Sequence, residues 1–217
     1  MMTPEMYLTV MGMGCVLVFI LSLVLNRDAV RQEVAATIKQ DISIQQMRDA
    51  EERVAIFLRG KGIAPGTDIL KIGETLNIYE GVSSPCVQGY AHLSLPNKDG
   101  LMSVTYRKGL KQPERKFAFA HECGHVINKD SLPIDRPTGK HKSSVEQEAD
   151  YVAAALLMPI DDVFEFLEQN NYHKASRQGR VRLISKLSRK YGMSKVVVLR
   201  RIREVCLVKD EGHLSVS

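Results

Sequence analysis

Hydrophobic residues are most concentrated near the start of the chain. Residues 7–25 read YLTVMGMGCVLVFILSLVL and contain no charged side chain. A helix of this length extends about 28 Å, close to the thickness of the hydrocarbon core of a bilayer. A cleaved signal peptide and a buried core helix are the alternatives. No Lys or Arg precedes the segment, however, and the residues that follow it do not form a small-residue cleavage site. We therefore predict a membrane anchor in residues 1–26.

The charges around this segment predict its orientation. Arg27, Arg31 and Lys39 lie on its C-terminal side, whereas Glu5 is the single side chain within residues 1–26 that is charged at neutral pH. Basic residues that flank a membrane segment favour the cytoplasmic side. The pattern therefore predicts a single-pass protein of the cell membrane, with the remainder of the chain in the cytoplasm.

After the anchor, helical and strand-like spacings succeed each other. A juxtamembrane helical segment is predicted over 27–60, ending at Gly60 and Gly62, and a short helix follows at 68–76. Residues 96–100 (PNKDG) have the composition of a hairpin loop. The strands predicted before and around this loop are 77–80, 87–95 and 101–107.

From Pro113 onward the hydrophobic spacing is helical. The predicted helices are 113–129, 143–157, 160–169, 178–190 and 195–204. The succession predicts an α+β fold, in which a small antiparallel-rich sheet packs on a helical core, with an N-terminal transmembrane helix and a helical C-terminal tail. The predicted regions are the anchor at 1–26, the juxtamembrane segment at 27–60, the core at 61–170 and a basic tail at 171–217.

Composition narrows the class of protein. The chain is 44% hydrophobic and 25% charged, which is typical of a globular protein and excludes a disordered one. The four cysteines contain no CxxC pair, which excludes a disulfide scaffold and a Cys-rich zinc finger and indicates a reducing compartment. Their positions are Cys15, Cys86, Cys123 and Cys206.

The strongest chemical signal lies in the predicted helix 113–129. Residues 121–125 (HECGH) match HExxH, and residues four apart share one helical face, so His121 and His125 can bind one zinc ion. Glu122 then lies beside the metal, where it can accept a proton from water as the catalytic base. An ordinary helix with surface or core histidines is the alternative. The apolar residues 117–120 (FAFA) instead predict a buried helix, in which unpartnered polar groups would be costly. The helical core is thus expected to be zincin-like.

A zinc hydrolase needs a third protein ligand and an open position for water. The predicted helix 143–157 supplies three candidate acids. Glu146 and Asp150 are four apart on one face, which suits a ligand and an outer acceptor that orients a zinc-bound histidine. Glu148 points elsewhere on the helical wheel and is the poorer ligand. The remaining alternative is that all three acids are solvated side chains in the N-terminal turn of this helix.

These motifs resemble the ImmA/IrrE family of metallopeptidases, whose pattern is an AHExGH helix followed by an acidic helix ending in LLMP. The matching stretches are RKFAFAHECGH at 115–125, EQEAD at 146–150 and ALLMP at 155–159. The resemblance covers roughly residues 50–205 and implies a cytoplasmic zinc-dependent endopeptidase that cleaves a helix-turn-helix transcriptional repressor. It implies His121, His125 and Glu146 as zinc ligands and Glu122 as the catalytic residue. The N-terminal anchor is not typical of the family.

Two parts of the proposed chemistry are left open by the sequence. The oxyanion of the reaction requires another donor, for which four residues are candidates, although each is by itself better explained as a surface or packing residue. They are Tyr106, His141, Tyr151 and His173. An extended substrate is expected to add a strand at an edge of the 87–107 hairpin.

The C-terminal tail is strongly basic. Between Asn171 and Lys209 there are twelve Lys or Arg residues and one acid, Glu204. Residues 187–202 have a helix–Gly turn–helix form with Ser194 as an N-cap. The tail can pack on the peptidase core, contact anionic lipid, or bind DNA through residues 171–209. The family resemblance favours packing.

The sequence thus predicts an anchored zinc endopeptidase acting on a regulatory protein. One alternative is a membrane quality-control protease of HtpX type, but such enzymes have several membrane segments and one is found here. The other is a non-catalytic module, in which zinc braces the fold and the tail binds nucleic acid. The intact HExxH motif and the later Glu argue against it.

Overall fold

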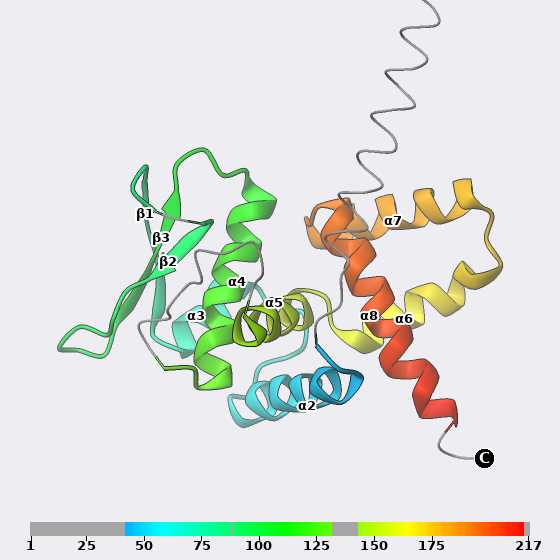
Figure 1. Cartoon of the computed structure of the whole chain (residues 1–217), viewed down its shortest axis with the longest axis horizontal. Helices are drawn as coiled ribbons and strands as arrows, with labels where there is room; N and C mark the ends of the chain where they lie inside the picture. Colours follow the sequence, from blue (N-terminus) through cyan, green and yellow to red (C-terminus); the bar gives the residue numbers. More distant parts are fainter. Residues whose placement is uncertain (1–41, 88, 132–142, 215–217) are drawn as a thin grey trace, which may run out of the picture. The chain divides into compact units, whose positions relative to one another are not determined.

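The computed structural model describes residues 42–87, 89–131 and 143–214. Within these residues, no helix has the length and apolar character needed to cross a membrane. The predicted anchor at 1–26 and the first part of the predicted 27–60 helix lie outside the described residues. The described part of the chain has an α+β fold, as predicted (Figure 1).

Three helices form the part of the fold that holds the candidate site. They are α2 (Ile44–Gly60), α4 (Gln112–Asn128) and α5 (Ser144–Leu157). α5 packs against both α4 and α2 (Figure 1), and almost all of its residues from Ala149 onward are buried. α2 begins at a capping box, in which Ser43 and Gln46 each accept a hydrogen bond from the other's backbone N–H. A short helix, α3 (Ile69–Thr75), follows α2 and packs against α4.

The sheet has three strands in the order β1-β3-β2. They are β1 (Ile78–Ser84), β2 (Ala91–Leu93) and β3 (Met102–Arg107). β2 and β3 form the predicted antiparallel hairpin, but β1 pairs in parallel with β3. The prediction of an antiparallel-rich sheet is therefore wrong: the sheet is mixed, because the hairpin returns β3 into the position between β1 and β2. β2 is also shorter than the predicted 87–95, since Gly89 takes φ 78° and interrupts the extended chain.

The last four elements follow α5 closely. They are α6 (Ile160–Gln169), the 3₁₀ turn η1 (Tyr172–Lys174), α7 (Arg177–Tyr191) and α8 (Lys195–Leu214). Gly192 ends α7 in the left-handed conformation, and Ser194 accepts a hydrogen bond from the Val197 N–H at the start of α8. α8 extends ten residues beyond its predicted end at 204, because no Gly or Pro interrupts it before Gly212.

The apolar side of α7 and α8 is part of the same core as the other helices. Together with the turn between these helices, it contributes Leu187, Tyr191, Met193, Val198, Ile202 and Val205 to that core. The wholly buried Arg201 of α8 binds Glu51 of α2 at 2.7 Å and donates to the Met158 carbonyl at the end of α5. These contacts give the tail a packing role. They do not test whether the tail also contacts lipid or DNA, so both interactions remain predictions.

Candidate metal centre

The HExxH residues lie in the C-terminal half of α4, on the side that faces α5. His121, Glu122 and His125 are at most 8% exposed. α4 ends at Lys129, which adopts the left-handed conformation at φ 61°, so that the Asp130 N–H donates back to the His125 carbonyl. The helix thus places both imidazoles on its buried face, as the four-residue spacing predicts.

Gly124 allows α5 to approach this face closely. A Cβ atom at Gly124 would lie 2.8 Å from the carbonyl oxygen of Ala149 in α5, a distance that real contacts essentially never show. The glycine within HECGH therefore has a packing role, because any larger residue would separate the helix of the histidines from the helix of Glu146.

The two histidines and Glu146 direct their donor atoms to one point. The two Nε2 atoms are 3.0 Å apart, His121 Nε2 is 3.3 Å from Glu146 Oε2, and His125 Nε2 is 3.6 Å from Glu146 Oε1. Among the described residues, these three form the one group of His, Cys, Asp or Glu side chains arranged to hold a metal ion. The structure brings together the three ligands predicted from the sequence.

The spacing of these atoms fits a tetrahedral ion. Zinc binds His nitrogen and carboxylate oxygen at about 2.0–2.2 Å, which places neighbouring donors about 3.3 Å apart. The observed separations of 3.0, 3.3 and 3.6 Å bracket this value. Glu146 Oε1 is also buried without a hydrogen-bond partner among the described residues. A cation is the natural partner for a buried carboxylate oxygen next to two imidazole nitrogens.

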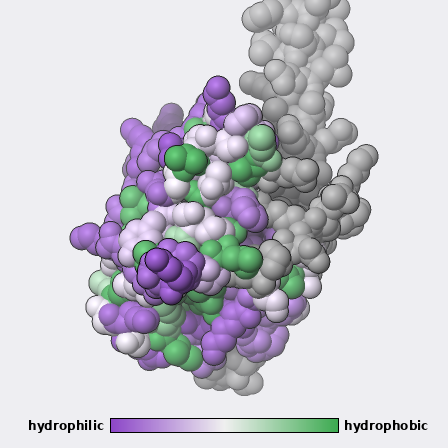
Figure 2. All heavy atoms as spheres, turned by 90° about the vertical axis from the view of Figure 1, so that its left-hand side faces the viewer, coloured by the Kyte–Doolittle hydropathy of each residue, from purple (hydrophilic) through white to green (hydrophobic). Residues whose placement is uncertain are grey.

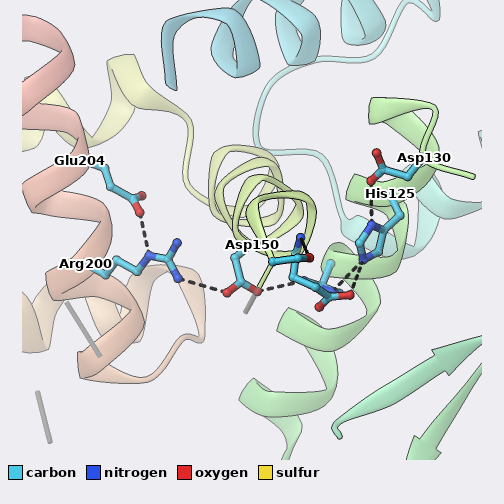
Figure 3. Close-up of polar contacts among 8 residues, drawn as sticks. His125, Asp130, Asp150, Arg200 and Glu204 are labelled. Carbon is cyan, nitrogen blue, oxygen red and sulfur yellow. Dashed lines mark hydrogen bonds and ion pairs between the residues drawn. The ribbon is translucent and has the colours of Figure 1, made fainter. Parts of the chain in front are cut away.

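Carboxylates behind the two rings set their tautomers. His121 Nδ1 lies 2.9 Å from Asp150 Oδ1. His125 Nδ1 lies 2.8 Å from Asp130 Oδ2 (Figure 3). An ionised carboxylate only accepts hydrogen bonds, so Nδ1 carries the proton in both rings and each Nε2 of a neutral ring presents a lone pair. Such outer carboxylates are the usual support of metal-binding histidines. Asp150, the residue predicted as the outer acceptor, contacts His121 in this way.

The same carboxylates change the pKa values of the site. Burial alone would lower the pKa of His121, but hydrogen bonds to Asp150 and Glu146 outweigh it and raise this pKa to about 9. Contacts with His121 and then His125 hold the pKa of Glu146 well below its usual range. This group of side chains therefore favours positive charge, whether a proton or a metal ion supplies it.

Glu148, the alternative ligand, has another partner. Its carboxylate forms an ion pair with Arg53 of α2. Glu146 lies two residues earlier, on a different face of α5, and its carboxylate contacts the histidines instead. The structure therefore distinguishes Glu146 from Glu148 as the candidate third ligand, whereas the sequence only favoured Glu146.

The described oxyanion candidates are bound elsewhere or exposed. The Tyr106 hydroxyl donates to Glu80 at 2.8 Å, and the Tyr151 hydroxyl donates to Glu51 at 2.9 Å. His173 is exposed on η1. His141 lies outside the described residues. None of the three described side chains is assigned to the oxyanion.

Two residues of the site have no counterpart in the sequence predictions. Asp130 supports His125, and Arg200 of α8 binds the second oxygen of Asp150 at 3.2 Å (Figure 3). Asp130 had a local signal, since it is the first acid after the motif and follows the end of the helix. Arg200 had none, because fifty residues separate it from Asp150.

Fold and donor set together define a metallopeptidase-like domain. The chain matches the family model of the IrrE N-terminal-like domain, Peptidase_M78, over residues 89–203, which is more than half of its length. The protein therefore belongs to this ImmA/IrrE family, as its motifs indicated.

No curated protein matches the sequence. Among solved structures, a Mycobacterium tuberculosis transcriptional regulator aligns with a TM-score of 0.47 and 18% sequence identity. The alignment covers 71% of this chain, which spans less than half of the regulator, 46% of its length.

Proposed function

We propose that this protein is a zinc-dependent endopeptidase that cleaves a regulatory protein, such as a helix-turn-helix repressor. The observation that carries the proposal is the convergence of His121, His125 and Glu146 next to the buried carboxylate of Glu122. Membership of a peptidase family supports the reaction class. Two imidazoles and one carboxylate are a donor set that catalytic zinc sites use, with one position left for water or substrate.

When bound by these three residues, zinc supplies Lewis acidity, which polarises a carbonyl group and makes water more acidic. Glu146 contributes a negative charge, and its low pKa keeps this carboxylate ionised at neutral pH. Asp150 and Asp130 hold the His121 and His125 rings with Nε2 toward the metal position. The three donor side chains are therefore already oriented for metal binding by their contacts within the protein.

Glu122 is the proposed general base and acid. It follows His121 directly on α4 and is 1% exposed. Its negative charge contributes to the raised pKa of His121, so it lies close to the metal-binding group. Glu122 accepts the proton of the attacking water and then delivers it to the amine of the leaving peptide.

The sheet suggests where the substrate lies. β3 is the central strand, so β2 is the hairpin strand at an edge of the described sheet, and it packs against α4. We place the extended substrate along β2, where main-chain hydrogen bonds would hold it next to the zinc helix. The sheet side of the molecule carries separate hydrophobic residues among hydrophilic ones (Figure 2). Tyr90 and Leu95, which lie on either side of β2, are both exposed.

The anchor and location complete the proposal. The uncharged stretch 7–25 has the length of a membrane-spanning helix, and the basic residues after it favour a cytoplasmic peptidase domain. A cytoplasmic active site would give the enzyme access to transcriptional repressors.

The test is co-expression of the full chain with repressors encoded next to it, followed by detection of repressor fragments. Glu122→Gln should reduce cleavage by about 10²- to 10⁴-fold, because it removes the proton acceptor. Its zinc content, measured by elemental analysis, should stay at the wild-type level. Glu114→Gln is the matched control, since Glu114 is exposed at the start of the same helix. Undiminished cleavage by Glu122→Gln would reject the mechanism.

A further inference from the structure

A chain of ionic contacts runs from the C-terminal helix to the candidate metal centre. Arg200 of α8 donates through Nε to Glu204 Oε1 at 2.7 Å and through Nη1 to Asp150 Oδ2 at 3.2 Å (Figure 3). The other oxygen of Asp150 accepts from His121 Nδ1 at 2.9 Å. One arginine of the basic tail therefore stands two contacts away from a metal-binding nitrogen.

The environment makes this arginine an ionic partner. Asp150 and Glu204 are each 5% exposed, and an isolated carboxylate at such a depth would be costly. Burial lowers the pKa of Arg200, but Glu204 and then Asp150 outweigh this and raise it. The guanidinium thus remains charged between two buried acids.

Arg200 also restricts the rotation of Asp150. The terminal torsion of an aspartate is broad, so the groups that bind its two oxygens set the orientation of the carboxylate. A second contact on the other oxygen fixes the plane of the group, and Glu204 holds the guanidinium in turn. Because Arg200 uses two different nitrogens for its two acids, a lysine at this position could not reproduce both contacts equally.

The neighbouring arginine has a different role. Arg201 binds Glu51 of α2 and the Met158 carbonyl, so it fastens α8 to the rest of the fold. Arg200 contacts the acid that supports a histidine of the metal centre. Of the two adjacent arginines, Arg201 therefore has a packing role and Arg200 has a role at the candidate site.

We propose that Arg200 is a positioning residue, which acts through Asp150 to hold His121 with Nε2 toward the metal. The proposal rests on the proposed function in one respect, namely that the site binds zinc. It connects the basic tail to the peptidase chemistry, because a change in the position of α8 would change the support of a ligand.

The test uses full-length protein stripped of metal, with zinc affinity measured by chelator competition. Arg200→Gln should weaken zinc binding by roughly 10-fold, the lower end of the effect of losing an outer-shell partner. Arg182→Gln is the matched control, since Arg182 is exposed on α7, and its affinity should equal that of the wild type. Arg200→Lys, which keeps the charge and loses one contact, should fall between the two, and it serves as the test if Arg200→Gln does not fold.

A double-variant experiment separates positioning from general stability. In the Asp150→Asn background, Arg200→Gln should cause no further loss of zinc affinity, because its effect passes through Asp150. The absorption spectrum of bound Co²⁺ should also change in Arg200→Gln and stay constant in Arg182→Gln. Equal zinc affinities in wild type, Arg200→Gln and Arg200→Lys would overturn the proposal, as would an undiminished effect in the Asp150→Asn background. Failure of the wild-type protein to bind zinc would instead reject the proposed function.

Discussion

The two histidines of the candidate metal centre are supported in different ways. His125 bonds to Asp130, which directly follows the end of the same helix, whereas His121 bonds to Asp150 of α5, which Arg200 of α8 holds. The side chain of Asp130 is 18% exposed and that of Asp150 is 7% exposed. One support is local and partly solvated, and the other is distant and buried.

This difference shows how the site depends on folding. The local support requires only that α4 ends at Lys129, so that the chain turns back toward His125. The distant support exists only when α4, α5 and α8 are packed together. Glu146, the third candidate ligand, belongs to the distant side as well. A metal ion would therefore join a local half-site to one that tertiary structure assembles.

The largest effect is expected from removing the charged ligand on the distant side. Glu146→Gln should weaken zinc binding by more than the 10- to 100-fold loss typical of an outer partner. Glu148→Gln should leave zinc affinity unchanged, since Glu148 pairs with Arg53. Chelator competition on the two variants measures this contrast. A larger loss in Glu148→Gln would show that the wrong acid has been assigned.

In the metal-free protein, the distant side should also make stability depend on pH. The folded-state pKa of His121 is raised from 6.5 to about 9, by hydrogen bonds to Asp150 and Glu146 that outweigh burial. A raised pKa contributes stability that is fully present below pH 6.5 and is lost as the pH rises through about 9. Urea denaturation of chelator-treated protein should show a decrease of about 3 kcal/mol across this window.

Asp150→Asn should flatten this pH profile, because the substitution removes the negative charge that faces His121. A profile that keeps its slope in Asp150→Asn would mean that the distant carboxylate does not control the charge of the ring.

The two supporting aspartates offer the most direct comparison. Asp150→Asn and Asp130→Asn should each weaken zinc binding by about 10- to 100-fold, with the larger loss in Asp150→Asn. The reason is burial: water can take over as the hydrogen-bond partner of His125 at the partly exposed position 130, but it cannot reach His121 at the buried position 150. Equal losses, measured by the same competition assay, would show that burial does not distinguish the two supports.

An effect of similar size to that of the two aspartate variants, but on stability, is expected at the contact between α4 and α5. Gly124→Ala places a Cβ atom 2.8 Å from the Ala149 carbonyl and should destabilise the fold by about 1–3 kcal/mol. Gly60→Ala is the control, because nothing lies within 4 Å of its Cβ position, and its effect should be close to zero. Thermal unfolding of both variants tests this. Wild-type stability in Gly124→Ala would show that α4 and α5 can separate freely.

Local patterns predicted most helices, but not the pairing of the sheet. Helix bounds follow from caps and spacing, as at Gly192 and Ser194 between α7 and α8. Strand order depends on which segments meet after collapse, and nothing in the sequence of β1 specifies a parallel partner. The strand expected at 87–95 became shorter because Gly89 adopts positive φ, a choice that glycine permits and does not require.

Some features of the candidate site could likewise be predicted from local patterns, and others depend on tertiary structure. The sequence by itself determined that the two imidazoles share one face of a helix, since residues four apart lie on the same side. It also identified Glu146 and Asp150 as one helical face. Only the tertiary structure decided that this face, and not Glu148, meets the histidines, and only it brought Arg200 to Asp150. The physical reason is that helix periodicity acts over four residues, whereas a contact across fifty depends on how whole helices pack.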